Sequence, residues 1–153
     1  MKKYTIHYNF YATIDVEVLA DSEEEAKNKA RNMDFDKEKD LDLELNEETV
    51  LEVEDIGSLT GIIEKAEDIV RNAQEEDRDI TLEPWPTVTT EYWTGEEMEY
   101  HRQIVDNVFW DDERNEIGIN TSESAADFGL SEFPDIEQLE ICRKIIAQTG
   151  ENK

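Results

Sequence analysis

The chain of 153 residues carries 41 acidic and 15 basic side chains, which gives a formal net charge of −26 at pH 7. Solubility of a small domain needs a net charge of only about 2 to 8 in magnitude, and repulsion beyond that opposes compactness. Such a surface excludes direct binding to nucleic acid without bridging cations. With 37% hydrophobic residues, the chain still has enough apolar material for one compact domain or two small subdomains.

The single cysteine, Cys142, limits redox and metal chemistry. One cysteine cannot form an intramolecular disulfide or a cysteine-based zinc site, which suits a reducing cytosol. No segment approaches the roughly 18 apolar residues of a membrane span, and strand-like alternation follows the first three residues. The sequence therefore predicts a cytoplasmic protein.

Alternating apolar residues begin the chain. They are Tyr4, Ile6, Tyr8 and Phe10 on one parity, and Ile14, Val16 and Val18 after a break near residues 11–13. This pattern predicts two strands or one long bulged strand. Two more short alternating stretches, residues 41–45 and 50–56, predict further strands.

A helix is expected between these strands, from residue 23 to about Met33. Ser22 stands three residues before Glu25, the spacing of a reciprocal capping box. Ala26 and Ala30 share one face and are small enough to lie close on a sheet. Residues 1–57 therefore predict a small β-β-α-β-β subdomain.

These first residues resemble the small DpnD/PcfM-like proteins of restriction systems and mobile elements. The match covers residues 15–26, with the sequence DVEVLADSEEEA, and the acidic strand VLEVEDI at residues 50–56. The resemblance implies a fold for about a third of the chain and an association with mobile DNA. That family has no established activity, so no functional residue is transferred.

Residues 58–153 predict a second, α+β subdomain, which could share one continuous core with the first. Ser58 can cap a helix to about Gln74, because apolar residues there follow the spacing of a buried stripe. Residues 80–82 could form a strand before the extended corner Pro84-Trp85-Pro86. Residues 87–93 are rich in β-formers.

The next segment permits two structures. Thr94, three residues before Glu97, could cap a short helix, or residues 98–104 could pair as an extended strand with residues 87–93. Further on, residues 105–110 and 116–120 flank a polar turn and favour a hairpin. Pro134 and Gly150 bracket a terminal helix with a stripe of Ile136, Leu139, Cys142 and Ile146.

No catalytic constellation can be named. His7 and His101 are the only histidines, and neither lies in a recognisable motif. Cys142 lies on an apolar stripe, where a lone cysteine is usually a small buried hydrophobe. Gly57 and Gly61 are isolated and form no phosphate-binding loop. We expect a protein without catalytic residues and without a cofactor.

Calcium binding is the metal hypothesis that needs testing, because acids occupy every second position from Asp34 to Glu44. Aligned with an EF-hand loop from Asp34, however, the required glycine is Lys39 and the bidentate glutamate is Leu45. The same acids fit the solvent face of a strand whose other face is apolar. No dedicated metal site is expected.

Six aromatic residues crowd the second half: Trp85, Tyr92, Trp93, Tyr100, Phe109 and Trp110. Aromatic residues beside charges are frequent in interfaces. Because residues 87–129 have modest aliphatic content, we expect these rings to build the core.

The acidic excess is global. Residues 1–57 hold 17 acids and 7 bases, and residues 58–153 hold 24 acids and 8 bases. Acids interleave with apolar positions, so a folded acidic surface is expected. The best candidates for a partner-binding surface are acids away from the helical stripe and acids of the turn: Glu64, Glu67, Asp68 and Glu75, with Asp111, Asp112, Glu113 and Glu116.

Two hypotheses follow. The first is a non-enzymatic acidic protein that mimics nucleic acid and occupies the basic groove of a restriction, CRISPR-type or other DNA- or RNA-binding protein of a host. The second is a structural or accessory module of a mobile-element assembly, in which the charge serves solubility or salt tolerance.

Overall fold

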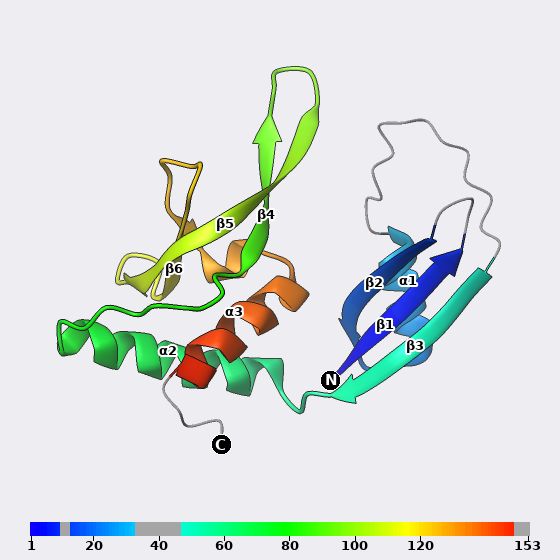
Figure 1. The fold of residues 1–153 in the computed structure, drawn as a ribbon, viewed down its shortest axis with the longest axis horizontal. Helices are drawn as coiled ribbons and strands as arrows, with labels where there is room; N and C mark the ends of the chain where they lie inside the picture. The colour runs from blue at the N-terminus through cyan, green and yellow to red at the C-terminus, as the bar shows by residue number, and fades with distance from the viewer. Residues whose placement is uncertain (10–12, 33–46, 149–153) are drawn as a thin grey trace. The chain divides into compact units, whose positions relative to one another are not determined.

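A computed structural model describes residues 1–9, 13–32 and 47–148 (Figure 1). The chain divides into two compact units, Met1–Ser58 and Leu59–Lys153. Each has its own cluster of buried hydrophobic residues. Helices and strands occur in both, so the expected α+β class is confirmed. In the described part of the chain, no helix has the length and apolar character needed to cross a membrane.

In its described residues, the first unit is a three-stranded antiparallel sheet with one helix. Its strands are β1 (Lys2–Asn9), β2 (Thr13–Ala20) and β3 (Glu47–Asp55), in the order β2-β1-β3. The amino-terminal pattern therefore forms two strands, paired from Lys2 with Ala20 to Asn9 with Thr13. The strand expected at residues 41–45 lies outside the described residues.

Helix α1 (Glu23–Asn32) covers this sheet through Ala26 and Ala30, which are fully buried. The Ser22 hydroxyl oxygen accepts the Glu25 amide at 3.2 Å, as the capping box requires. The Glu25 carboxylate, however, accepts the amide of Asp21 at 3.1 Å instead of that of Ser22. Of the two hydrogen bonds of the predicted capping box, the one to the Ser22 hydroxyl is confirmed. The one to the Glu25 carboxylate comes from the amide one residue earlier than predicted.

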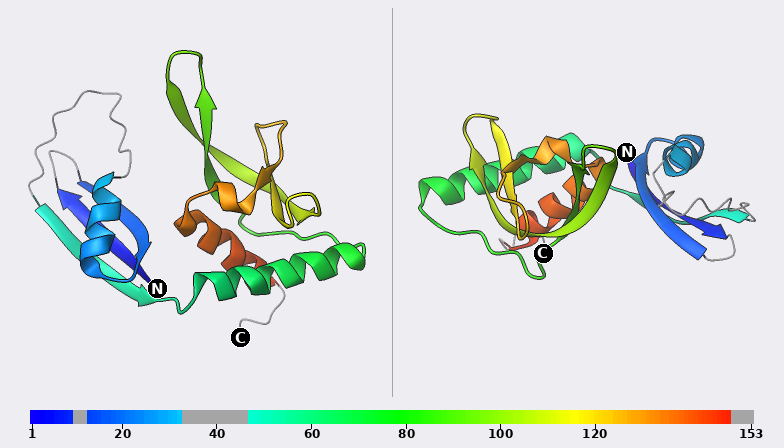
Figure 2. Two further views of the ribbon diagram at one scale, coloured as in Figure 1. Left: turned by 180° about the vertical axis from the view of Figure 1, so that it is seen from behind. Right: turned by 90° about the horizontal axis from the view of Figure 1, so that it is seen from above.

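The second unit places two helices with a four-stranded antiparallel sheet (Figures 1 and 2). The helices α2 (Leu59–Glu75) and α3 (Asp135–Gln148) confirm both predicted helices, and they pack against each other. The strands lie in the order β4-β5-β6-β7. They are β4 (Thr87–Trp93), β5 (Met98–Asp111), β6 (Glu116–Thr121) and β7 (Phe128–Gly129).

A β-bulge at Asp106 determines which side chains of β5 are buried. The register with β6 shifts between Val105 and Asn107, so Asp106 is an extra residue. Val105, Val108 and Trp110 consequently share the buried face despite their mixed parity. We call this face, which meets the helices, the inner face, and the opposite one the open face.

Two local expectations change in this unit. Residues 80–82 form no strand, although Ile80 and Leu82 are buried as part of the core. Residues 94–97 form a turn instead of a helix, in which the Thr94 hydroxyl oxygen accepts the amides of Glu96 and Glu97. The extended alternative for residues 98–104 is therefore confirmed, as is the hairpin that pairs Asp111 with Glu116.

The expectation that all six aromatic residues build the core is wrong. Trp110 is buried, but Tyr92, Trp93 and Tyr100 are 60%, 59% and 49% exposed. Aliphatic residues outside the β-rich segment, among them Leu82 and Ile145, take the places in the core that the rings were expected to fill. Cys142 is fully buried in that core, as expected.

Candidate partner-binding surface

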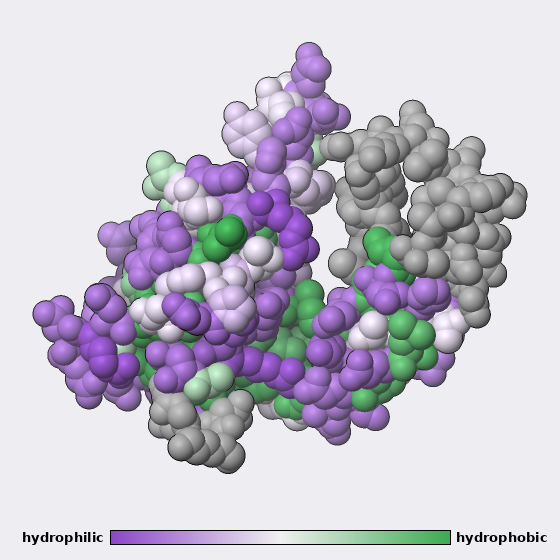
Figure 3. All heavy atoms as spheres, viewed as in Figure 1, coloured by the Kyte–Doolittle hydropathy of each residue, from purple (hydrophilic) through white to green (hydrophobic). Residues whose placement is uncertain are grey.

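Helix α2 presents acids on the side away from its buried stripe. Glu64, Asp68 and Glu75 are exposed, whereas Ala66 and Val70 are buried. With a rise of about 1.5 Å per residue, Glu64 and Asp68 lie about 6 Å apart along the helix axis. The face of the second unit seen in Figure 3 is correspondingly dominated by hydrophilic residues, drawn in purple.

Glu67 is more buried than Asp68 beside it on α2, with its side chain 20% exposed against 69%. Burial raises the pKa of its carboxyl, Arg71 opposes that rise, and the charge of Glu116 adds to it. Glu67 of α2 and Glu116 of β6 therefore lie close enough for their charges to interact, so one member of each predicted cluster is near the other.

Arg71 links α2 to β5. Its guanidinium lies 3.5 Å from the Asp68 carboxylate and 3.9 Å from that of Glu67, and 4.5 Å from the centre of the Trp110 ring. A cation over a tryptophan face gains electrostatic attraction. Arg71 thus neutralises part of the acidic row and holds it against the sheet.

The turn acids have different roles. Asp111 accepts the amides of Glu113 and Arg114 and the Arg114 guanidinium at 2.6 Å, and these hydrogen bonds lower its pKa. Glu116 accepts the amide and hydroxyl of Ser131. The expectation that these two are exposed is wrong, because both are partly buried: Asp111 fixes the hairpin turn, and Glu116 binds Ser131 beyond the hairpin.

Five of the eight predicted residues are exposed. We call them the exposed acidic set: Glu64, Asp68, Glu75, Asp112 and Glu113. Of these, only Asp68 has a lysine or arginine within ion-pair distance in the described residues. The set therefore has charge available for an external cationic partner.

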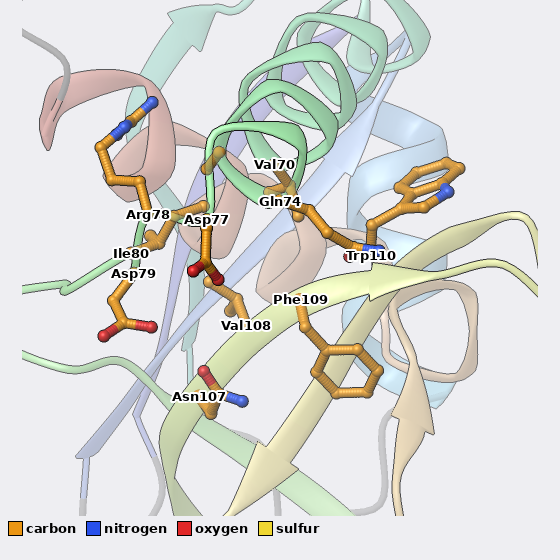
Figure 4. A pocket seen from close by; sticks show the side chains of 11 residues that line it. Val70, Gln74, Asp77, Arg78, Asp79, Ile80, Asn107, Val108, Phe109 and Trp110 are labelled. Carbon is orange, nitrogen blue, oxygen red and sulfur yellow. The ribbon is translucent and has the colours of Figure 1, made fainter.

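Two acids just beyond α2 were not among the predicted site residues. Asp77 and Asp79 line a surface pocket of about 200 Å³ together with Val108 and Trp110 of β5 (Figure 4). Figure 4 shows the last turns of α2 above that strand. The acidic run at residues 75–79 is the signal in the sequence that could have pointed to them. The pocket lining brings no nucleophile beside a base.

The two histidines lie in exposed strand pairs. His7 Nδ1 is 2.6 Å from Asp15 Oδ1 across β1 and β2. His101 Nε2 is 3.2 Å from Glu99 Oε2, and its ring meets Tyr92 edge-on at 6.2 Å. Glu99 lies on the same strand as His101, whereas His7–Asp15 and His101–Tyr92 are cross-strand pairs. Such cross-strand pairs contribute about 0.2–1 kcal/mol to a sheet.

The calcium hypothesis concerns residues 34–45, which lie outside the described residues. Within the described ranges, no group of three or more His, Cys, Asp or Glu is placed to hold a metal ion.

Comparison with known proteins adds no relative: no family model, curated protein or solved structure matches the chain. The similarity of residues 15–26 and 50–56 to DpnD/PcfM-like proteins stays a prediction.

Proposed function

We propose that this protein is a non-enzymatic acidic binding protein that acts in the cytoplasm, where it occupies the basic groove of a DNA- or RNA-binding protein, such as a restriction or CRISPR-type effector. The observation that carries the proposal is the exposed acidic set, in which four of five carboxylates have no internal cation among the described residues. Carboxylates without internal partners are free to bind lysine and arginine.

The charge density supports mimicry of a duplex. The second unit carries 24 acids and 8 bases, a net charge of −16. A globule of its length has a radius of gyration of about 12 Å and hence a diameter of about 32 Å. Duplex DNA of that length carries about 19 phosphate charges. A groove that accommodates DNA would thus meet a similar charge per unit length.

The test measures salt dependence and competition. A partner recovered from host lysate should bind with micromolar or tighter affinity, lose at least about tenfold between about 50 and 200 mM salt, and be displaced by duplex DNA. Salt-independent binding, or binding alongside DNA, would contradict the proposal.

A matched pair of variants localises the surface. Glu64→Gln with Asp68→Asn should weaken binding and flatten its salt dependence. Glu24→Gln with Glu52→Gln makes the same change in charge at exposed positions of the first unit and should leave binding within about twofold. Equal effects of the two pairs would assign the binding to total charge alone.

A second candidate is an accessory module of a mobile-element assembly, in which the charge serves solubility or salt tolerance. The observation that favours it is that both units are acidic, with net charges of −10 and −16. Comparable acidity in neighbouring proteins of the same organism would support this candidate over mimicry.

A further inference from the structure

The outer half of the β4–β5 hairpin, residues 91–101, forms an arm that stands away from the rest of the second unit (Figures 1 and 2). At its root, Gln103 donates to the Thr90 hydroxyl at 3.0 Å and accepts from the Thr121 hydroxyl. This hydrogen-bonded chain on the inner face ties the arm to β6. The arm is therefore anchored, and its position relative to the sheet is fixed.

The open face of the hairpin carries four of its five exposed large apolar side chains, and the fifth, Tyr92, lies on the opposite face. Directly opposed residues share a face, and the register pairs Trp93 with Met98, Glu91 with Tyr100 and Thr87 with Ile104. Trp93, Met98, Tyr100 and Ile104 are 59%, 42%, 49% and 51% exposed. We call these four residues the arm patch. A two-stranded ribbon is only marginally stable by itself in water, so such a face gains from being covered.

The charge around the arm patch indicates what covers it. Residues 91–104, which span the arm patch, contain Glu91, Glu96, Glu97 and Glu99 against one arginine and no lysine. That arginine, Arg102, donates to the Thr87 hydroxyl at 2.6 Å. A second copy of the chain would oppose the same glutamates to each other, which costs energy. The complementary surface is apolar and carries cations.

The outer edge of β4 is also open. Thr94 N donates to Glu97 O and Val105 N to Pro86 O, so the hydrogen-bonded pairs of this ladder fall on even positions of β4. The backbone amides at odd positions of β4 point away from β5. One of them, the Thr89 amide, donates to the Glu137 carboxylate. The amides of Glu91 and Trp93 lie further along this edge, where an extended segment can add as a strand.

We propose that the arm is the docking site for an extended segment of the partner protein whose side chains are both basic and apolar, with the apolar ones packed on the arm patch. The inference rests on the proposed function for the cationic nature of the partner. It adds that charge alone does not select this partner.

The test uses short synthetic peptides as probes. One alternates lysine and leucine, one lysine and serine, and one glutamate and leucine. The lysine–leucine peptide should bind about tenfold or more tightly than either of the others, since both its charge and its apolar groups are complementary. In nitrogen-15 spectra it should shift the indole signal of Trp93, while those of Trp85 and Trp110 stay in place.

Variants then separate the arm from the acidic set. The double variant Trp93→Ser with Tyr100→Ser should bind the lysine–leucine and lysine–serine peptides equally. Unchanged indole signals of Trp85 and Trp110 verify that this variant is folded. Leu51→Ser with Val53→Ser is the matched control, because those residues are 54% and 49% exposed in the first unit. Glu64→Gln with Asp68→Asn should keep the preference.

Three results would overturn the inference: equal binding of the lysine–leucine and lysine–serine peptides, an unchanged preference in the arm variant, or a Trp93 shift that depends on protein concentration without peptide, which indicates self-association. A preserved peptide preference in a protein that fails to compete with DNA would instead reject the proposed function and leave the arm as a docking site.

Discussion

A single glutamate on α3 shows how this acidic chain tolerates charge near its core. Glu137 accepts the Thr89 amide through Oε1 at 2.5 Å, while its buried Oε2 has no partner. Burial raises the pKa of this carboxyl, against the opposing effect of the Thr89 hydrogen bond. Because the folded pKa lies above the unfolded one, the ionised group lowers stability at neutral pH, and this cost disappears as pH falls below the unfolded pKa.

We therefore expect Glu137→Gln to raise the melting temperature at neutral pH, with a gain that shrinks toward about pH 4. Glu137→Ala should lower stability by about 1 kcal/mol, because the Thr89 amide loses its acceptor. Thermal unfolding at several pH values measures both. A gain for Glu137→Gln that does not change with pH would refute the electrostatic cause.

The Cys142 thiol tests the core prediction directly. Burial, with a smaller contribution from the charge of Glu67, raises its pKa to about 12. A thiol-specific reagent at about pH 8 should therefore react at least about a thousandfold more slowly with the folded protein than with the unfolded one. Reaction of the folded protein at the unfolded rate would show that α3 does not bury this stripe.

Residue identity predicted some of these roles and not others. The burial of Cys142 and the Ser22 cap followed from local spacing, because helix geometry alone determines them. The role of Asp111 did not, since an aspartate that fixes a turn and one that faces solvent look the same in sequence. Only the positions of the Glu113 and Arg114 amides separate the two.

At the scale of elements, the β5–β6 hairpin depends on a glycine paired with an aromatic ring. Gly118 is the register partner of Phe109, and a Cβ on Gly118 would overlap the Phe109 ring. Gly118→Ala should therefore cost about 1–3 kcal/mol of stability. In a Phe109→Ala background the same change should cost clearly less, because the overlapping ring is gone. Urea unfolding of the wild type, the two single variants and the double variant gives a double-mutant cycle. If the two losses of stability are additive, the Gly118–Phe109 contact is contradicted.

Helices and hairpins were predictable, while the face of each strand was only partly so. The helices α2 and α3 follow from continuous apolar stripes. The bulge at Asp106 moves burial from one parity to the other within β5, and no local pattern marks it. The exposure of Trp93 and Tyr100 was also not predictable, for a different reason. Aliphatic side chains distant in sequence fill the core, so the arm keeps its rings outside.

For the whole molecule, the net charge of −26 sets two electrostatic effects against each other. Ion pairs such as Arg31 with Glu48 and Lys3 with Glu54 stabilise the fold, and salt weakens the exposed ones. Repulsion among the excess acids destabilises it, and salt weakens that as well. With 41 acids and 15 bases, repulsive pairs outnumber attractive ones, so repulsion should dominate.

Raising sodium chloride from about 10 to 150 mM shortens the screening length from about 30 to 8 Å. We expect the melting temperature to rise by several degrees over this range. Glu64→Gln with Glu75→Gln should raise it at low salt and reduce its salt dependence, because neither carboxylate has an ion-pair partner among the described residues and the change removes only repulsion. Sodium fluoride in place of the chloride separates screening from specific anion binding. A melting temperature that falls with salt would mean that the ion pairs dominate. The acidic surface would then be organised by its own cations, and fewer carboxylates would be available to a partner than the exposed acidic set implies.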